Sequence, residues 1–241
     1  IDLSLTVAYE SKVNYGDIFS QVRVWDTLIA NHLMKKNICV PPREDHIKET
    51  KYEGAYVKEP QLGQHKWVVS FDINSLYPHI IIQYNISPEK ILGVKSSGVS
   101  VAKMLSNKTP LAHLKTEGAC ITPNGAMFKN DSQGFLPEMM ETMYNERVIY
   151  KKRMLKAKKE YEKTKDPKLV KEISRCHNIQ WARKIALNSA YGAVGNQYFR
   201  YYDVRQASGI TTAGQFIIRF IESKVNEYLN RILQTHDKID Y

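Results

Sequence analysis

Apolar residues near the start of the chain recur at a helical spacing. Those between Val24 and Leu33 fall on one side of a helix. We expect this helix to be followed by a break at Pro41-Pro42, because proline cannot continue a helix. Residues 43–66 are polar and are expected to form a loop.

Two apolar runs follow in the centre of the chain. Val68, Val69 and Phe71 are strand-forming residues, and they predict a strand that ends at Asp72. The run from Ile80 to Ile82 is short and continuous, so it predicts either a buried helix or a buried strand.

The second half of the chain is dominated by helical patterns. Asn124-Gly125, flanked by apolar residues, predicts a hairpin turn. From Glu138 onward a long helix is expected, and Asp166-Pro167 marks the turn to a second helix. Arg147 and Lys151 are one helical turn apart on the first of these helices, so they point the same way.

A helix is also expected over residues 183–192. Lys184, Asn188 and Tyr191 are spaced four and three residues apart and share one face, while small and apolar residues occupy the other. Gly192 is expected to end or loosen this helix where Tyr191 is presented.

The positive charge of the chain is concentrated in one segment. The 241 residues contain 35 Lys and Arg against 25 Asp and Glu, a net charge of +10. Residues 147–184 alone contain 14 basic and four acidic residues, which accounts for the whole excess. Such a patch favours a polyanionic partner, either a nucleotide or a nucleic acid. For the lysines from Lys152 onward, a solvated helix face is the preferred interpretation.

The remaining composition excludes several classes of protein. Three cysteines lie far apart without metal-ligand spacing, so they are expected to be free thiols in a reducing compartment. The sequence shows neither a signal peptide nor an apolar run near 18 residues. We therefore expect a soluble intracellular protein with no membrane partner.

The residues around Asp72 suggest phosphate chemistry. A carboxylate at the end of a strand can hold Mg²⁺, and the backbone N–H groups near Asn74-Ser75 can bind phosphate oxygens. An Asp that simply caps a turn is the structural alternative.

Four segments together resemble the family B DNA polymerases. Residues 68–89 read VVSFDINSLYPHIIIQYNISPE, where DxxSLYP resembles the family's first polymerase motif and NISPE resembles the T-even-type phage branch. Residues 183–202 read RKIALNSAYGAVGNQYFRYY and resemble the KxxxNSxYG signature. Residues 145–151, NERVIYK, resemble an NxRxxxK pair, and residues 52–60, YEGAYVKEP, resemble the linker between the exonuclease side and the palm.

The resemblance implies a role for each matching residue. In the family, these positions bind metal, nucleotide, the nascent base pair and template. The metal would be held by Asp72, with the Ile73 carbonyl as a further ligand. The triphosphate would contact the Ser75 and Leu76 amides, Arg147, Lys151, Lys184 and Asn188, and Tyr77 would lie under the sugar and reject a 2′-OH. Tyr191 and Gly192 would pack on the nascent pair, and Tyr52 and Gly54 would touch the template.

The resemblance also implies a fold, a reaction and partners. The expected class is α/β (α+β): an incomplete family B polymerase palm sheet with helical-hairpin fingers. Residues 1–43 would be the exonuclease-side region and linker, 44–133 and 197–241 the palm, and 134–196 the fingers. The reaction would add dNMP from dNTP to a primer 3′-OH on a DNA template, with two Mg²⁺, or Mn²⁺, per complete site. The resemblance points to a phage protein acting in the cytoplasm of the infected bacterium.

One part of the family's catalytic set does not occur in the sequence. The YGDTDS string that carries the second metal-binding Asp is absent, and Asp240 matches no family ligand. We therefore expect a fragment whose remaining C-terminal part, or a second polypeptide, carries that Asp and the thumb. One alternative is a nucleotide- or nucleic-acid-binding half of a split polymerase, inactive by itself. A protein-primed polymerase is disfavoured by the short spacing between Glu89 and Pro123.

The single carboxylate predicts that the chain alone does not extend a primed template. Two-metal phosphoryl transfer needs ions about 4 Å apart, clamped by more than one carboxylate. A primer-extension assay with Mg²⁺ or Mn²⁺ should therefore show no product. Extension that disappears in Asp72→Ala would contradict the missing-ligand interpretation.

Overall fold

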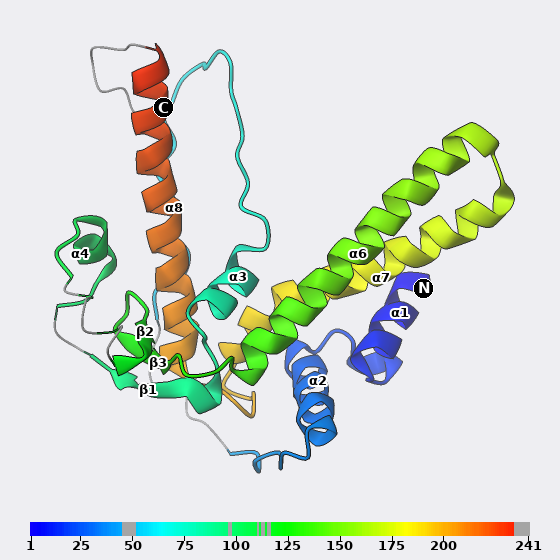
Figure 1. Ribbon diagram of the computed structural model, residues 1–241, viewed down its shortest axis with the longest axis horizontal. Helices are drawn as coiled ribbons and strands as arrows, with labels where there is room; N and C mark the ends of the chain where they lie inside the picture. The colour runs from blue at the N-terminus through cyan, green and yellow to red at the C-terminus, as the bar shows by residue number, and fades with distance from the viewer. Residues whose placement is uncertain (45–51, 96–97, 110, 112–113, 115–116, 234–241) are drawn as a thin grey trace.

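The protein is mostly helical and carries one small antiparallel sheet (Figure 1). The computed structural model describes residues 1–44, 52–95, 98–109, 111, 114 and 117–233. Two long helices form a hairpin that projects away from the rest of the molecule (Figure 1). The predicted class, helices with a sheet, is confirmed.

Helices account for most of the described residues. They are α1 (Asp2–Ser11), α2 (Gln21–Lys35), α3 (Leu76–Gln83), α4 (Val101–Leu105), α6 (Phe135–Thr164), α7 (Pro167–Val194) and α8 (Val204–Leu233), with short 3₁₀ turns at Tyr15–Asp17 and Pro88–Lys90. The helices expected between Val24 and Leu33, from Glu138 and through residues 183–191 are confirmed. The run at Ile80–Ile82 is a helix, since it lies within α3.

The sheet contains the predicted hairpin. Strands β1 (Ile91–Val94), β2 (Ala119–Ile121) and β3 (Ala126–Lys129) pair antiparallel in the order β1-β3-β2. Gly125 in the turn has φ of 87°, and a Cβ there would lie 2.4 Å from a carbonyl oxygen of Lys95. Both constraints require glycine at this position.

The predicted turn between the two long helices is also confirmed. Pro167 is the first residue of α7, where its missing N–H costs nothing. Asp166 caps the helix by accepting a hydrogen bond from the Lys168 N–H at 2.9 Å.

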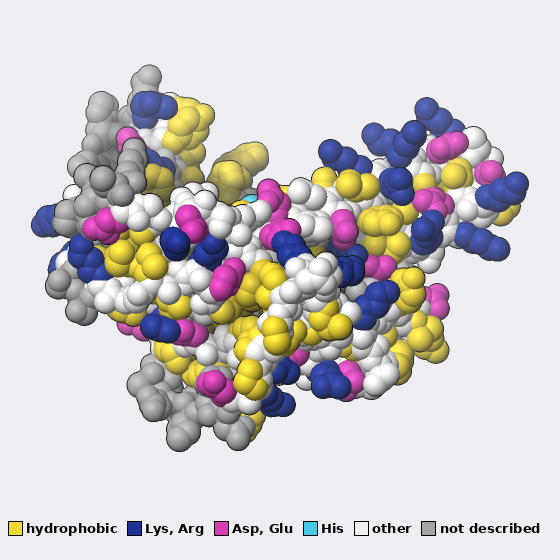
Figure 2. Space-filling view, turned by 60° about the horizontal axis from the view of Figure 1, so that its bottom comes forward, with side chains coloured by type: hydrophobic (Ala, Val, Ile, Leu, Met, Phe, Trp, Pro, Cys, Tyr) yellow, Lys and Arg dark blue, Asp and Glu magenta, His cyan; other side chains and the backbone are white. Residues whose placement is uncertain are grey.

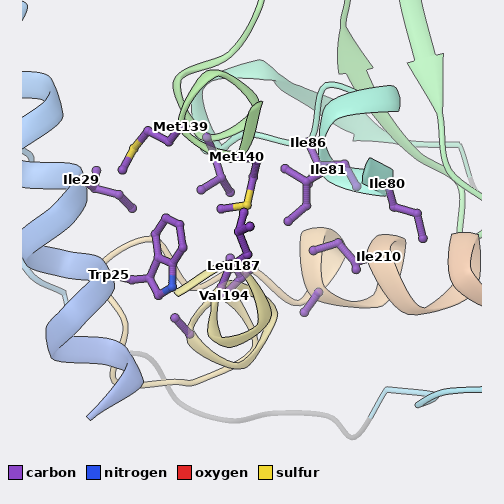
Figure 3. Packing of buried hydrophobic residues seen from close by; sticks show 14 of the residues in the cluster. Trp25, Ile29, Ile80, Ile81, Ile86, Met139, Met140, Leu187, Val194 and Ile210 are labelled. Carbon is purple, nitrogen blue, oxygen red and sulfur yellow. The ribbon is translucent and has the colours of Figure 1, made fainter. Parts of the chain in front are cut away.

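The hydrophobic core lies where α2, α3, α6, α7 and α8 meet (Figure 3). Small residues on α7, Ala186 and Ala190, are buried and allow its neighbours to approach closely. Trp25 on α2 is 1% exposed, and its indole N–H donates to the Ala186 carbonyl and the Ser189 hydroxyl, both at 3.1 Å. This residue therefore joins α2 to α7 by packing and by hydrogen bonding.

The predicted strand before Asp72 is wrong. The segment has neither helix nor strand, and the side chains of Val68, Val69 and Phe71 are at least 70% exposed. A strand requires a partner for its backbone groups. Among the residues that the structure describes, only β1, β2 and β3 form a sheet, and none of them pairs with this segment.

The expected helix end at Gly192 is also wrong. Helix α7 continues to Val194, and Gly195 follows as its C-cap. Gly192 instead permits close contact with α2, because a Cβ there would lie 2.0 Å from the Gln21 side-chain oxygen. The glycine therefore lies within the helix, beside the Gln21 side chain, and does not end it.

Trp25→Ala should lower the free energy of unfolding by about 3–5 kcal/mol, because a large buried side chain is replaced by a cavity. Trp25→Phe should cost less, since it retains much of the packing and loses the indole hydrogen bonds. Urea unfolding of the chain measures both. The control is Trp67→Ala, where the side chain is 97% exposed and the change should stay within about 0.5 kcal/mol.

Candidate nucleotide-binding site

A cavity of about 380 Å³ lies where the start of α3 meets α6 and α7. Three segments that are distant in the sequence supply its walls. The lining residues are Asp72, Ile73, Asn74, Ser75, Leu76, Tyr77, Pro78, Arg147, Lys184 and Asn188. Eight of these were predicted as site residues from the sequence, Asn74 was predicted to lie in the phosphate-binding turn, and Pro78 is added by the structure.

The turn before α3 brings a carboxylate and a hydroxyl to the cavity wall. Asp72 is exposed there, and Ser75 adopts a left-handed conformation with φ of 52°. The Ser75 carbonyl accepts a hydrogen bond from the His79 N–H at 3.1 Å, which starts the first turn of α3. A left-handed non-glycine residue at this position marks a tightly determined turn.

Arg147 supplies the cavity with a cation from α6. One guanidinium nitrogen, Nη1, donates to the Ser75 hydroxyl at 3.3 Å. Its Nε is buried and has no hydrogen-bond partner in the part of the chain that the structure describes. A half-buried guanidinium with a spare donor is suited to an anionic ligand with several oxygens.

Arg183 holds α6 and α7 together beside the cavity. Its guanidinium pairs with Glu146 at 2.8 Å and with Glu10 of α1 at 2.6 Å. Glu146 immediately precedes Arg147, and Arg183 immediately precedes Lys184. Two members of this ion-pair group are therefore sequence neighbours of the two cations of the cavity. The sequence patterns did not reveal it, since its three members come from separate helices.

The α7 wall presents Lys184 and Asn188 one helical turn apart. The Lys184 ammonium lies 4.6 Å from the centre of the Trp181 ring, a cation–π contact that limits its range of positions. Lys151, by contrast, is exposed on α6 one turn beyond Arg147 and does not line the cavity.

Three tyrosines from separate segments form a layer beside the cavity. The rings of Tyr77 and Tyr191 are 4.8 Å apart between centres, and the Tyr191 hydroxyl donates to the Tyr52 hydroxyl at 3.3 Å. Glycines make room for them, because a Cβ at Gly195 would lie 2.3 Å from the Tyr52 hydroxyl. Burial raises the pKa of Tyr191, and the hydrogen bond to Tyr52 raises it further.

The segment that begins at Tyr52 runs alongside α8 (Figure 1). Nothing in the sequence predicted this contact. Its carbonyl groups accept hydrogen bonds from α8: Thr211 donates to the Glu53 oxygen and Gln215 to the Gly54 oxygen, both at 2.8 Å. An ion pair of 2.7 Å joins Lys58 to Glu222 further along the helix. Of the two predicted template residues, Gly54 is therefore bonded to α8, and Tyr52 is bonded to Tyr191 of α7.

The cavity has too few metal-binding side chains to hold a magnesium ion by itself, so a bound ligand would have to supply further oxygen atoms to the ion. Asp72 is the single carboxylate among the lining residues. No cluster of three or more metal-ligating side chains occurs within the described ranges. Mg²⁺ is commonly held by one or two carboxylates together with substrate phosphates, so Asp72 suits a metal–triphosphate complex.

The chain belongs to DNA polymerase family B. The sequence model of this family matches residues 15–240 of the chain. The chain is 35% identical to the DNA-directed DNA polymerase of Escherichia phage RB69 over 98% of its own length. It is 31% identical to the DNA-directed DNA polymerase of Enterobacteria phage T4 over 99% of its length. The resemblance to the T-even-type branch is thereby confirmed.

A solved structure supports the same fold. The family B DNA polymerase from the archaeon Pyrobaculum calidifontis superposes with a TM-score of 0.66 over 96% of this chain, at 23% identity. The chain spans 30% of the length of each of the two phage relatives and 27% of the archaeal chain. In addition, no helix within the described ranges is both long and apolar enough to cross a membrane.

The half-buried Tyr191 predicts a specific pH dependence of stability. The pKa of Tyr191 is raised above its ordinary value of 10.0 in the folded chain, so folding favours the protonated phenol. This stabilisation is complete below pH 10 and is lost as the pH rises above it. The free energy of unfolding should therefore fall above pH 10, and Tyr191→Phe should make that fall shallower.

The measurement is urea unfolding between pH 8 and pH 11, in steps of about half a pH unit. The control is Tyr198→Phe, because Tyr198 is exposed and should contribute little. An identical alkaline slope for Tyr191→Phe and the unmodified chain would contradict the assignment.

Proposed function

We propose that the chain is the palm-and-fingers part of a DNA-directed DNA polymerase that adds dNMP from dNTP to a primer 3′-OH. The observation that carries the proposal is the meeting of Asp72, Arg147 and Lys184 in one cavity, from three separated motifs of family B. One carboxylate and two cations around a space of about 380 Å³ suit a metal-bound triphosphate.

Arg147 and Lys184 would hold the triphosphate. The Arg147 guanidinium has unused donors and a planar shape that matches phosphate oxygens. Lys184 provides a point charge held against Trp181, and Asn188 an amide on the same wall. The Ser75 and Leu76 N–H groups lie at the first turn of α3, where the helix dipole favours an anion. Lys151 would join from α6 if the ligand extends beyond the cavity.

Asp72, with the Ile73 carbonyl, would hold Mg²⁺ or Mn²⁺ between the chain and the phosphates. When bound, the metal would neutralise phosphate charge during phosphoryl transfer. Tyr77 lies at the cavity wall with its ring against Tyr191, so its edge would reject a ribose 2′-OH. These roles use only residues that already line or adjoin the cavity.

The remaining assignments rest on the resemblance to family B. Tyr191 and Gly192, at the end of α7, would pack on the nascent base pair, and Tyr52 and Gly54 would lie along the template strand. The α6–α7 hairpin, within residues 134–196, would be the fingers. Residues 44–133 and 197–241 would be the palm, and residues 1–43 would belong to the exonuclease side.

The partners would be a primer–template duplex, dNTP and the part of the polymerase that carries the second catalytic Asp and the thumb. That part would be either a continuation of this polypeptide or a second polypeptide. The likeness to two phage polymerases supports a proposed site of action in the cytoplasm of an infected bacterium.

A second candidate function is nucleic-acid binding by the hairpin without nucleotide selection. The observation in its favour is the concentration of Lys and Arg over the projecting end of the α6–α7 hairpin (Figure 2). Under this alternative the basic residues would act as a group, through phosphate contacts that differ little from one another.

Nucleotide affinity separates the two functions. Arg147→Ala and Lys184→Ala should each weaken binding of a fluorescent dATP analogue, mant-dATP with Mg²⁺, by about 2 kcal/mol, or roughly 30-fold. Affinity for a primer–template duplex, and its salt dependence, should change little. Fluorescence titration measures the first quantity and anisotropy the second.

The control variant is Lys158→Ala, further along α6 on the exposed part of the hairpin. It should leave mant-dATP affinity within about twofold, far below the roughly 30-fold effects at the cavity. Equal effects from Lys158→Ala and Lys184→Ala would refute the nucleotide site. A uniform loss of duplex affinity, with the salt slope lowered by about one, would favour the second candidate.

A further inference from the structure

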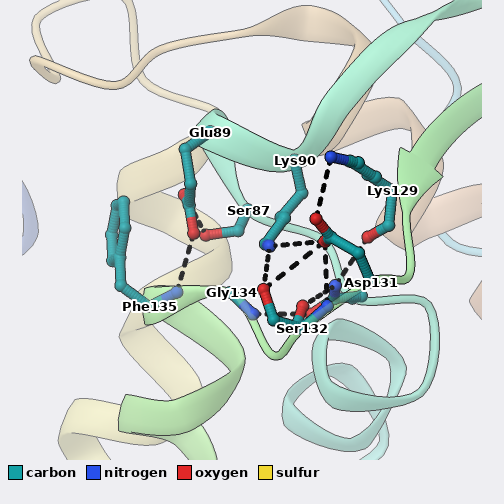
Figure 4. A network of polar contacts seen from close by, with 9 residues as sticks. Ser87, Glu89, Lys90, Lys129, Asp131, Ser132, Gly134 and Phe135 are labelled. Atoms are coloured by element: carbon teal, nitrogen blue, oxygen red, sulfur yellow. Dashed lines mark hydrogen bonds and ion pairs between the residues drawn. The ribbon is translucent and has the colours of Figure 1, made fainter.

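A distant turn of the chain caps the start of α6 (Figure 4). The first N–H groups of a helix have no partner within the helix. Here they donate to side chains of residues 85–89, which we call the capping turn. The bonds run from Gly134 N to Asn85 Oδ1 (2.8 Å), from Phe135 N to Glu89 Oε1 (2.8 Å) and from Leu136 N to Ser87 Oγ (3.3 Å). The next residue, Pro137, has no N–H, so every N–H group in the first turn of α6 is accounted for.

Asn85 is the central residue of the capping turn. Its side chain is buried, and its amide nitrogen donates to the carbonyls of Lys129 at 2.7 Å and Ser132 at 2.9 Å. Its backbone is left-handed, with φ of 52°, and ends α3 in a motif where the Ile86 N–H bonds the Ile81 carbonyl at 3.0 Å. One residue therefore ends α3 with its backbone and caps α6 with its side chain.

The loop that receives Asn85 is itself fixed. Lys90 is 9% exposed, and its ammonium donates to Asp131 at 2.8 Å and to the Ser132 hydroxyl at 2.7 Å (Figure 4). Hydrogen bonds from Lys129 and Lys90 lower the pKa of the Asp131 carboxyl. The capping turn is thus hydrogen-bonded to a loop, residues 129–132, that is itself held by hydrogen bonds.

The capping turn lies at the opposite end of α3 from the cavity. The two helices run in opposite directions, with Asn85 next to Gly134 at one end and Ser75 bonded to Arg147 at the other. At 1.5 Å per residue, Arg147 is about 20 Å along α6 from its cap. A rotation of about 5° at the cap would move its guanidinium by about 2 Å, which exceeds the tolerance of a preorganised site.

We propose that Asn85 is a positioning residue that fixes the direction of α6 from α3 and thereby keeps Arg147 on the triphosphate. The proposal rests on the nucleotide site proposed above, and it adds a determinant that contacts no nucleotide. Ser87 and Glu89 support the same clamp, with one hydrogen bond each to the first turn of α6.

The sharpest variant is Asn85→Gly, because glycine accepts the left-handed backbone and removes only the side chain. The chain offers a matched control in Asn37→Gly. Asn37 has φ of 56° and ends α2 in the same motif, with the Ile38 N–H bonded to the Leu33 carbonyl at 3.0 Å, and its side chain is exposed. Glu89→Ala is a milder variant, since it removes one capping bond and leaves Asn85 in place. Circular dichroism first establishes that each variant is folded.

Two measurements test the clamp. The first is mant-dATP affinity with Mg²⁺, where Asn85→Gly should lose at least about tenfold and Asn37→Gly less than twofold, with Glu89→Ala between them. A double-mutant cycle then asks whether Asn85 acts through Arg147. In the Arg147→Ala background, Asn85→Gly should cause little further loss.

The second measurement needs no nucleotide. Spin labels at Lys158→Cys on α6 and Lys224→Cys on α8, in a chain with Cys39 and Cys120 replaced by serine, report the distance between hairpin and body. The distribution should broaden or shift in Asn85→Gly and stay unchanged in Asn37→Gly. A mere loss of stability would not produce this pattern in a folded variant.

The outcomes distinguish the clamp from the nucleotide site. Unchanged affinity and an unchanged distance distribution in Asn85→Gly would overturn the clamp, as would an affinity loss fully additive with Arg147→Ala. If the unmodified chain binds no mant-dATP, the proposed function fails. The role of Asn85 toward a nucleotide then fails with it, while a changed distance distribution would still support the clamp between α3 and α6.

Discussion

The antiparallel packing of α3 against α6 decides whether this chain has a site at all. Ser75 and Arg147 lie 72 positions apart in the sequence, and their side chains meet because these two helices lie side by side. The contact is apolar at the capped end, where Ile81 and Met140 are fully buried, and aromatic further along, where the rings of His79 and Tyr144 are 4.6 Å apart. Burying such side chains contributes about 1.5–3 kcal/mol each, enough to hold polar groups in place at the cavity.

The same packing leaves most of the hairpin outside the core. Buried residues are frequent near the start of α6 and the end of α7, whereas toward the turn the described helices carry mainly Lys, Arg and Glu on exposed positions. The positive charges gathered there repel one another, and an anionic ligand would reduce this repulsion. The proposed ligand-binding groups therefore lie at the boundary between a well-packed base and a solvated arm, where modest movement is least costly.

Hydrogen bonds between distant segments link the parts of the proposed site. Tyr52 meets Tyr191 through its hydroxyl, and the following carbonyls are held by Thr211 and Gln215 of α8. The stretch that would follow a template strand is therefore joined to the aromatic layer at the cavity. The proposed template side and the proposed nucleotide side are therefore connected through one set of hydrogen bonds.

The sequence by itself determined the features that depend on near neighbours. The helix through Trp25, the hairpin turn at Gly125 and the break at Pro167 follow from side-chain periodicity and from the backbone limits of glycine and proline. The four motifs were also sufficient to indicate family B. Eight of the residues chosen from them line one cavity.

Tertiary structure decided everything that needed a partner from elsewhere in the chain. Val68 to Phe71 have strand-forming side chains, but a strand exists only when another strand completes its hydrogen bonds. Gly192 looked like a helix stop, but it lies within α7 with the Gln21 side chain of α2 close to its Cα. Asn85 belonged to a recognised motif, yet its function as the cap of α6 depends on Gly134, 49 positions away. Periodicity reports which face of an element is apolar, and only the folded chain determines which groups that face and its ends will meet.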